Sequence, residues 1–268
     1  MNLNSIKSIL TLRYDYTQIP TLPRLKWEDL EKKEEFSLED INNQLTSHLY
    51  KQIPKNYSGP ISISLSGGVD SSLALCLLKQ NFPENQIDAI SIKFSDSIDE
   101  TETASKIAKK VGVDHHIIEI DNFLEKLSDA ISITKLPFWD IHWIYVAENA
   151  KNFSNYLVSG DGGDELFGGY VFRYSKFLSK INSNSSPKDK IQAYLSCHER
   201  DHVPEQELIF DKKMQFNWND IYDKLYPFFN NPLSPIEQVF LADYNGKLLY
   251  NFSIINNSIA KHFNLNSV

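Results

Sequence analysis

The chain has 268 residues, of which 41% are apolar and 23% are charged, so it can form one large domain or two small ones around a real core. Its net charge of −8 argues against general binding to nucleic acid or to an anionic membrane. The two cysteines, Cys76 and Cys197, are too few for a disulfide framework or a four-cysteine zinc site, and they fit a reducing cytosol.

The N-terminal residues contain no apolar segment of the kind that signal peptides carry. No run approaches the roughly 18 consecutive apolar residues of a membrane-spanning helix. We therefore expect a cytoplasmic protein with neither a nucleic-acid partner nor a membrane partner.

The first 36 residues are mixed in character and are predicted to be a lead-in or linker, not a domain. Ser37-Leu38-Glu39-Asp40 is typical of a capping box at the start of a helix. Apolar residues then recur at helical spacing from Ile41 to Ile53, so a helix is expected there.

From residue 61 onward, short β-branched runs alternate with helical patterns. Strands are predicted at 61–65, 87–94, 115–120 and 156–158, and helices at 70–80, 100–111, 123–133 and 141–150, with Gly112 at a C-cap position. This alternation predicts a parallel, doubly wound sheet. Residues 170–268 contain no convincing strand and are predicted to be mostly helical, with a loop around 182–187.

Seven of the ten glycines fall in two short stretches that directly follow predicted strands. The first, Ser66-Gly67-Gly68-Val69-Asp70-Ser71-Ser72, lies between a strand and a helix, and the second runs from Ser159 to Tyr170. Open parallel sheets bind ligands at the carboxyl ends of their strands. Both stretches are therefore candidates for one ligand site.

The first stretch has the chemistry of a phosphate cradle. Adjacent glycines let the backbone approach a ligand, and the amides of the turn and of the helix N-terminus attract an anion. Asp70 would repel phosphate unless a divalent cation lies between them. No Gly-x4-Gly-Lys-Ser/Thr and no Gly-x-Gly-x-x-Gly string occurs, so this is neither a Walker loop nor a dinucleotide fingerprint.

These residues resemble two signatures of known proteins. Ser66-Gly67-Gly68-Val69-Asp70-Ser71 is similar to the pyrophosphate loop (PP-loop) of the ATP-pyrophosphatase superfamily, and the string from Ser159 to Tyr170 resembles the second signature of asparagine synthetases and β-lactam synthetases. The fold class expected is α/β: a doubly wound, mostly parallel five-stranded sheet of the adenine nucleotide alpha hydrolase-like type. A lead-in at 1–36, a PP-loop ATP-binding core at 37–170 and a helical C-terminal part of the same synthetase domain at 171–268 are expected.

The resemblance implies an ATP-dependent amide ligase. ATP adenylates a carboxylate, typically the aspartate side chain, pyrophosphate departs, and ammonia converts the acyl-adenylate to an amide and AMP. The nucleotide-binding residues that the resemblance implies are Leu65, Ser66, Gly67, Gly68, Val69, Ser71, Ser72, Ile92, Ser159 and Gly160. The catalytic residues that it implies are Asp70, Asp164 and Glu165, with Asp70 and Asp164 as ligands of Mg²⁺. Glu165 also has a structural interpretation, as an acid favoured by a helix dipole.

Two departures from the family pattern bear on the activity. The family's N-terminal glutaminase domain uses a cysteine after the initiator Met, but Asn2 stands there and only about 60 residues precede the loop. We therefore expect the nitrogen to come from free ammonia, from another amine or from a separate glutaminase subunit.

The second departure lies near the end of the sequence. The charged positions of a later family segment fall here on Ile255, Asn257, Ser258, Asn266 and Val268. Charge that stabilises a reacting centre is commonly a large catalytic term, so its loss is expected to weaken turnover more than ATP binding. Two alternatives stay open: a PP-loop ligase for another carboxylate, and a nucleotide-binding subunit with weak or no catalysis.

One further pattern is discounted. His198-Glu199-Arg200-Asp201-His202 matches the His-Glu-x-x-His string of zinc metalloproteases. Pro204 disfavours continued helix at that point, so we interpret the string as a solvated polar helix end.

Overall fold

The computed structural model describes residues 2–31, 36–95, 99–136, 140–197, 206–210 and 212–268. The zinc-like string at 198–202 lies outside these residues. The chain divides into two compact units, which are described separately: an α/β unit of residues 34–161 and 255–268, and a helical unit of residues 1–33 and 162–254. The domain boundaries expected from the sequence, at 36 and 170, remain predictions.

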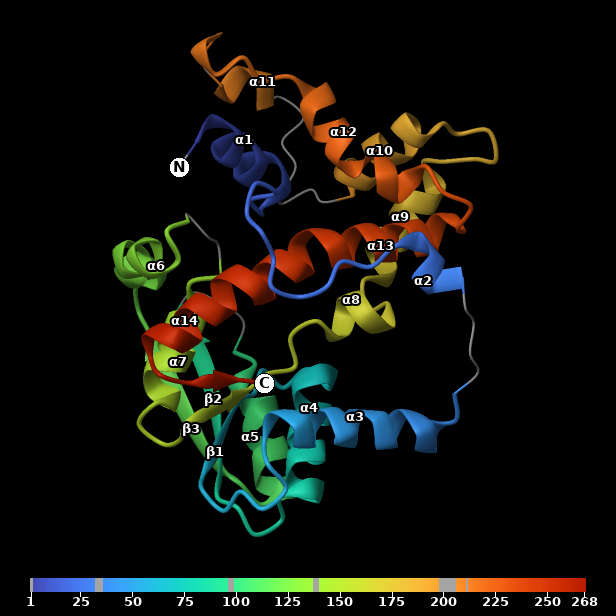
Figure 1. The fold of residues 1–268 in the computed structure, drawn as a ribbon. Coiled ribbons are helices and arrows are strands. Elements are labelled where there is room, and N and C mark those ends of the chain that lie inside the picture. The colour runs from blue at the N-terminus through green and yellow to red at the C-terminus, as the bar shows by residue number, and fades with distance from the viewer. Residues whose placement is uncertain (1, 32–35, 96–98, 137–139, 198–205, 211) are drawn as a thin grey trace. The chain divides into compact units, whose positions relative to one another are not determined.

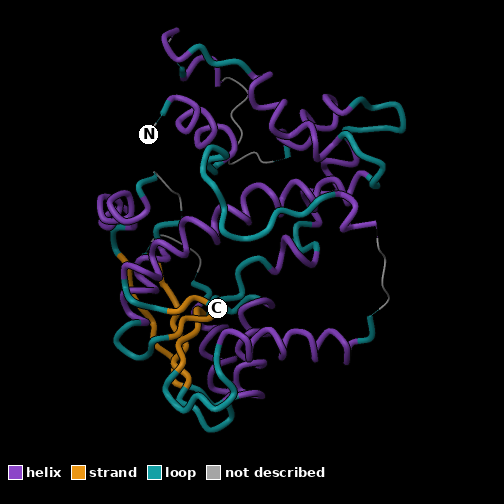
Figure 2. The backbone as a smooth tube through the Cα atoms, viewed as in Figure 1, coloured by secondary structure: helices purple, strands orange, loops and turns teal. Residues whose placement is uncertain are grey.

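The α/β unit is built on a five-stranded parallel sheet, drawn in orange in Figure 2. The strand order is β3 (Asp114–Ile120), β2 (Ile87–Phe94), β1 (Ile61–Ser64), β4 (Tyr156–Val158) and β5 (Asn266–Ser267). All four pairs of neighbouring strands are parallel. The predicted five-stranded parallel fold is confirmed, and the four strands placed from the sequence start and end within about one residue of their predicted bounds.

Helices cover both faces of this sheet, which makes it doubly wound (Figure 1). Along β1, Ile61 and Ile63 pack against one face with α3 (Leu38–Gln52), α4 (Val69–Asn81) and α5 (Thr101–Val111). Ile90 of β2 points to the opposite face and packs with α6 (Leu127–Thr134), α7 (His142–Ala150) and α14 (Asn257–His262). Successive side chains of a strand alternate between faces, so two apolar cores form, one on each side of the sheet.

The fifth strand corrects the expectation that residues 170–268 contain no strand. Asn266 N donates to the Asn155 carbonyl (2.8 Å) and Val268 N donates to the Leu157 carbonyl (2.9 Å), so the C-terminal residues extend the sheet beyond β4. The segment is two residues long, polar and exposed, and it therefore has no hydrophobic alternation that could reveal it in the sequence.

Local signals set several helix boundaries. The predicted capping box is confirmed: Asp40 N donates to Ser37 Oγ (3.1 Å), and Ser37 N donates to Asp40 Oδ2 (3.0 Å). Gly112 ends α5 in the left-handed conformation with φ +76°, as its C-cap position predicts. The helix predicted over 123–133 begins as a 3-10 turn, η1 (Phe123–Lys126), before α6.

The helical unit contains the remaining elements. Its described helices are α1 (Leu3–Leu12), α2 (Trp27–Glu31), α8 (Gly163–Phe167), α9 (Val171–Ser179), α10 (Pro187–Ser196), α11 (Gln206–Ile209), α12 (Trp218–Phe229) and α13 (Pro235–Asp243), with the short 3-10 turn η2 (Lys212–Met214). The π-helical segments η3 (Tyr244–Leu248) and η4 (Asn251–Asn256) follow α13, and the last two residues of η4 belong to the α/β unit. Phe177, Ile191, Leu225 and Phe229 form the centre of its core. Within the described ranges, no helix is both long and apolar enough to cross a membrane.

Candidate nucleotide-binding site

The first glycine stretch forms a tight connection between β1 and α4. Gly67 has φ +82°, a conformation that favours glycine, and Gly68 is the N-cap of α4 without a side-chain cap. A Cβ atom on Gly67 would lie 3.1 Å from Ala104 N and 3.3 Å from Glu100 O, so the loop packs directly on the start of α5. Position 67 therefore requires glycine for both its φ angle and its space.

Serine hydroxyl groups form hydrogen bonds within this loop. Ser66 N donates to Ser71 Oγ (3.2 Å), and Gly68 N donates to Ser66 Oγ (3.2 Å). The Ser72 hydroxyl donates to the Gly68 carbonyl oxygen (2.6 Å). The serines predicted to contact phosphate thus also hold the shape of the loop, while Ser66, Gly68 and Val69 remain exposed.

The second glycine stretch begins against the first turn of α4. A Cβ atom on Gly160 would fall 2.4 Å from Ser71 N and 2.6 Å from the carbonyl carbon of Asp70. Ser159 N donates to the Val268 carbonyl oxygen (3.1 Å), which ties the same segment to the end of the chain. Within the α/β unit, the structure therefore brings together the Ser66–Ser72 loop, Ser159 and Gly160, and their role in nucleotide binding stays a prediction.

Leu65 and Ile92 lie at the carboxyl ends of their strands but belong to different cores. The Leu65 side chain is 1% exposed and packs with α4 and α5, whereas Ile92 is partly buried against the core on the other face. Any contact of Leu65 with a nucleotide must therefore use its backbone. The nucleotide-binding role of Ile92 stays a prediction.

A hydrogen-bond chain, which the sequence alone does not reveal, reaches the base of the loop. The Ser91 hydroxyl donates to the Leu65 carbonyl oxygen (2.5 Å), Ser91 Oγ lies 2.7 Å from His115 Nε2, and Ser105 Oγ lies 3.0 Å from His115 Nδ1. Because Ser91 has only one proton and gives it to Leu65, His115 donates to Ser91 from Nε2, and the neutral ring then accepts from Ser105 at Nδ1. Burial, with His116 nearby, lowers the pKa of His115, which agrees with this neutral imidazole.

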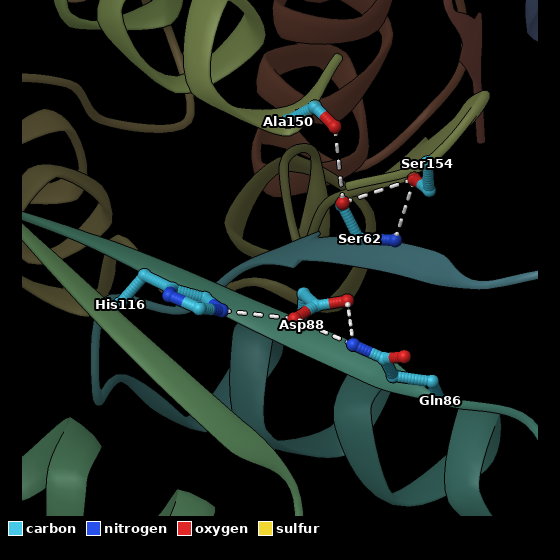
Figure 3. Close-up of polar contacts among 6 residues, drawn as sticks. All are labelled: Ser62, Gln86, Asp88, His116, Ala150 and Ser154. Carbon is cyan, nitrogen blue, oxygen red and sulfur yellow. Dashed lines mark hydrogen bonds and ion pairs between the residues drawn. The ribbon is translucent and has the colours of Figure 1, made fainter. Parts of the chain in front are cut away.

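A second polar group lies nearer the amino ends of the strands, away from the glycine stretches (Figure 3). Buried Asp88 is 2.8 Å from His116 Nε2 and accepts from Gln86 Nε2 (3.2 Å). Ser62 N donates to Ser154 Oγ (3.0 Å), which links β1 to the start of β4. These contacts satisfy polar groups inside the sheet, so we assign them a structural role.

Two acidic residues of the second stretch, Asp164 and Glu165, lie in the helical unit, on the five-residue helix α8. Gly168 N and Gly169 N each donate to the Asp164 carbonyl oxygen (3.0 Å). A Cβ atom on Gly169 would overlap Asp164 Oδ1, at 1.7 Å, so glycine at 169 leaves room for this carboxylate. Glu165 Oε1 accepts a hydrogen bond from the Tyr170 hydroxyl (2.9 Å).

The carboxylates of Asp70 and Asp164 suit Mg²⁺ by donor type, because this ion prefers hard oxygen ligands and binds through one or two carboxylates plus waters and phosphate oxygens. Asp70 belongs to the α/β unit and Asp164 to the helical unit, and both are half-buried. Among the described residues, no group of three or more His, Cys, Asp or Glu side chains is arranged to hold a metal. Joint binding of one ion by Asp70 and Asp164 therefore stays a prediction that requires further ligands from nucleotide or water.

The positions where the family carries later charges take part in building the α/β unit. Ile255 is buried in the core beside α7, and Asn257 and Ser258 form the start of α14. Asn266 pairs with Tyr156 in the sheet, and the Val268 amide bonds to β4. These positions supply packing and backbone pairing instead of charge.

A parallel sheet of this order, with helices on both faces and a glycine-rich loop between β1 and α4, defines a doubly wound α/β fold. The family model for asparagine synthase matches residues 56–243, which is more than half of the chain. The chain belongs to the asparagine synthase family.

Individual relatives match over shorter segments. An asparagine synthetase homologue of the glutamine-hydrolyzing type from Methanocaldococcus jannaschii is 33% identical over 117 residues, which cover 42% of this chain and 23% of that protein. Asparagine synthetase (glutamine-hydrolyzing) 1 from Bacillus subtilis is 30% identical over 117 residues, which cover 41% of this chain and 18% of that protein. The chain thus spans about a fifth of the length of these curated relatives. The solved NH3-dependent NAD synthetase from Campylobacter jejuni is similar at 17% identity, covering 78% of this chain and 94% of that chain, with a TM-score of 0.42.

Proposed function

We propose that the chain is the synthetase part of an ATP-dependent amide ligase whose first candidate substrate is the side-chain carboxylate of aspartate. The observation that carries this proposal is the packing of Gly160 against the Asp70–Ser71 turn, in a chain of the asparagine synthase family. It joins the two glycine signatures at the carboxyl edge of a parallel sheet, where such sheets bind ligands.

The reaction has two steps. A carboxylate oxygen attacks the α-phosphorus of ATP, and the bond from that phosphorus to pyrophosphate breaks, giving an acyl-adenylate. Ammonia then attacks the acyl carbon, the bond to AMP breaks, and the ammonia nitrogen loses a proton as the amide forms. A free carboxylate is a poor electrophile, so the mixed anhydride supplies the leaving group that amide formation needs.

Each part of the chain has a role in this scheme. The backbone amides around Ser66 to Ser71 that are not bonded within the loop itself bind the departing pyrophosphate, and Gly160 packs against the same loop. Asp70 and Asp164 would hold Mg²⁺, which neutralises charge on the phosphate oxygens when bound. Glu165 faces the acceptor. The nitrogen donor in this scheme is ammonia.

A second candidate function is nucleotide binding with weak or no turnover. It is favoured by Ile255, which is buried in the apolar core at a position where the family resemblance places a charge. A ligase for a carboxylate other than aspartate is the third candidate, because the acceptor is the part of the reaction that the motifs specify least.

Exchange of labelled pyrophosphate into ATP, with Mg²⁺ and aspartate, tests adenylation directly. We expect exchange that depends on aspartate and falls on the order of 100-fold in Asp70→Asn. Asp129→Asn is the matched control, because Asp129 is an exposed acid in the first turn of another helix, α6. Exchange with a different carboxylate would redirect the substrate assignment, ATP binding without exchange would favour the nucleotide-binding subunit, and loss of both would refute the proposal.

A further inference from the structure

Glu165 is the first member of a series of polar contacts within the helical unit. Its Oε1 accepts from the Tyr170 hydroxyl (2.9 Å), and the Arg173 guanidinium carbon lies 4.6 Å from the centre of the Tyr170 ring. Arg173 donates from a terminal nitrogen to both carboxylate oxygens of Asp243, at 3.0 and 3.3 Å. The Tyr194 hydroxyl donates to Asp243 Oδ1 (2.7 Å). These side-chain contacts thus connect α8, α9, α10 and α13.

The Arg173–Asp243 end of this series of contacts is held by several interactions. The Arg173 and Asp243 side chains are 13% and 5% exposed, so both charges are largely removed from water and each depends on its partner. Two contacts from one terminal nitrogen of Arg173 and one from the Tyr194 hydroxyl hold the Asp243 carboxylate. The Arg173 guanidinium in turn packs on the face of the Tyr170 ring.

Tyr170 keeps its proton at all ordinary pH values. Burial raises the pKa of Tyr170, and the neighbouring carboxylates of Glu165 and Asp164 raise it further. Its hydroxyl is therefore a donor, and Glu165 is the acceptor that it contacts.

We propose that Tyr170 is a positioning residue for Glu165: its hydroxyl holds the Glu165 carboxylate toward the acceptor, and the Arg173–Asp243 pair holds the Tyr170 ring. The catalytic meaning of this arrangement rests on the proposed function. Glu165 lies on a five-residue helix and has three side-chain torsions, so without this bond its carboxylate would sample several orientations. Precise orientation of a reacting group is worth large factors in rate.

The chain contains a matched pair of tyrosines for the test. Tyr174 lies four residues after Tyr170 and is 8% exposed, and its hydroxyl has no hydrogen-bond partner within the part of the chain that the structure describes. Tyr170→Phe and Tyr174→Phe each remove one oxygen and keep the ring. We expect Tyr170→Phe to lower kcat for carboxylate-dependent pyrophosphate exchange about tenfold without changing KM for ATP, because a bond to a charged acceptor is lost. Tyr174→Phe should leave both values unchanged.

A unit-wide packing defect would instead affect both variants and would appear in KM as well. Equal kcat values for wild type and Tyr170→Phe would overturn the proposal. Rescue gives a further readout: Tyr170→His retains a ring donor and should recover part of the lost kcat, whereas Tyr170→Leu should not.

The contact can also be tested without any activity. A double-mutant cycle of Tyr170→Phe and Glu165→Ala, measured as the free energy of unfolding in urea, should be non-additive, with the double variant losing less than the sum of the singles. Additive losses would show that the pair does not interact and would overturn the positioning role. Absence of pyrophosphate exchange in the wild type would count against the proposed function alone. The double-mutant cycle would still show whether Tyr170 and Glu165 interact.

Discussion

The backbone at Gly160 lies directly on the amide of Ser71, since a Cβ atom at position 160 would come within 2.4 Å of the Ser71 nitrogen. The second glycine signature therefore acts on the first one physically, by packing against the turn that carries Asp70. Gly160 has no positive φ, so the restriction at this position is purely one of space.

Gly160→Ala should accordingly displace the start of α4. We expect a loss of about 1–3 kcal/mol in unfolding free energy, which is typical of overpacking, together with a fall of at least about tenfold in ATP affinity. Calorimetric titration with ATP and urea unfolding measure the two effects.

Gly112→Ala is the matched control for this substitution. Its φ of +76° makes alanine strained, but no atom lies within 4 Å of the added Cβ. It should destabilise the protein by about 1 kcal/mol and leave the ATP dissociation constant unchanged. If both variants lose ATP affinity equally, the effect at Gly160 is general destabilisation and not a local one.

Hydrogen bonds link Ser105, His115, Ser91 and the Leu65 carbonyl in series. This series predicts that His115 helps to hold the geometry of the Ser66–Ser72 loop. His115→Leu leaves the buried Ser91 oxygen without its donor, which should cost about 1–3 kcal/mol and weaken ATP binding. His115→Gln can donate its side-chain amide to Ser91 and should retain most of the affinity. Identical ATP dissociation constants for the two variants would contradict this role.

His115 also predicts a pH dependence of stability. Burial lowers its pKa in the folded state below the unfolded value near 6.5, so the unfolded chain binds more protons. The contribution of neutral His115 is present above that value and is lost as pH falls through the folded pKa. Urea unfolding below pH 6.5 should show a shallower decline in His115→Gln than in wild type. Other groups, including His142 with its lowered pKa, titrate in both proteins and cancel in the comparison.

The pattern of the α/β unit was largely predictable because it depends on local signals. Ile61 and Ile63 alternate with serines, which defines a strand with a buried face, and Ser37 with Asp40 marks a helix start. Positions 67 and 160 stood out because glycine clusters follow strands. The strand Asn266–Ser267 had no such signal: its place depends on backbone bonds to β4, more than 100 residues earlier.

The contacts that orient the site residues were not visible in the sequence for a related reason. Ser91 meets His115 because β2 and β3 pair with Ala89 opposite His115, and this register follows from packing of the whole sheet. Arg173 meets Asp243 across 70 residues, and their residue types alone do not identify the pair. Local patterns thus indicate which segments make up the candidate site, while tertiary pairing determines which side chains hold those segments in place.

The last prediction concerns the stability contributed by the Arg173–Asp243 pair. Arg173→Leu leaves the Asp243 carboxylate buried without its cation, and breaking a buried pair in this way should cost about 3–5 kcal/mol of unfolding free energy. Tyr194→Phe removes only one neutral donor to the same carboxylate and should cost about 1–2 kcal/mol. Replacing both charges, as Arg173→Leu with Asp243→Leu, should recover part of the loss, since no uncompensated charge remains. Urea unfolding of wild type and these three variants measures the series. A double variant less stable than Arg173→Leu would show that the pair stabilises the fold by more than the mutual compensation of its two charges.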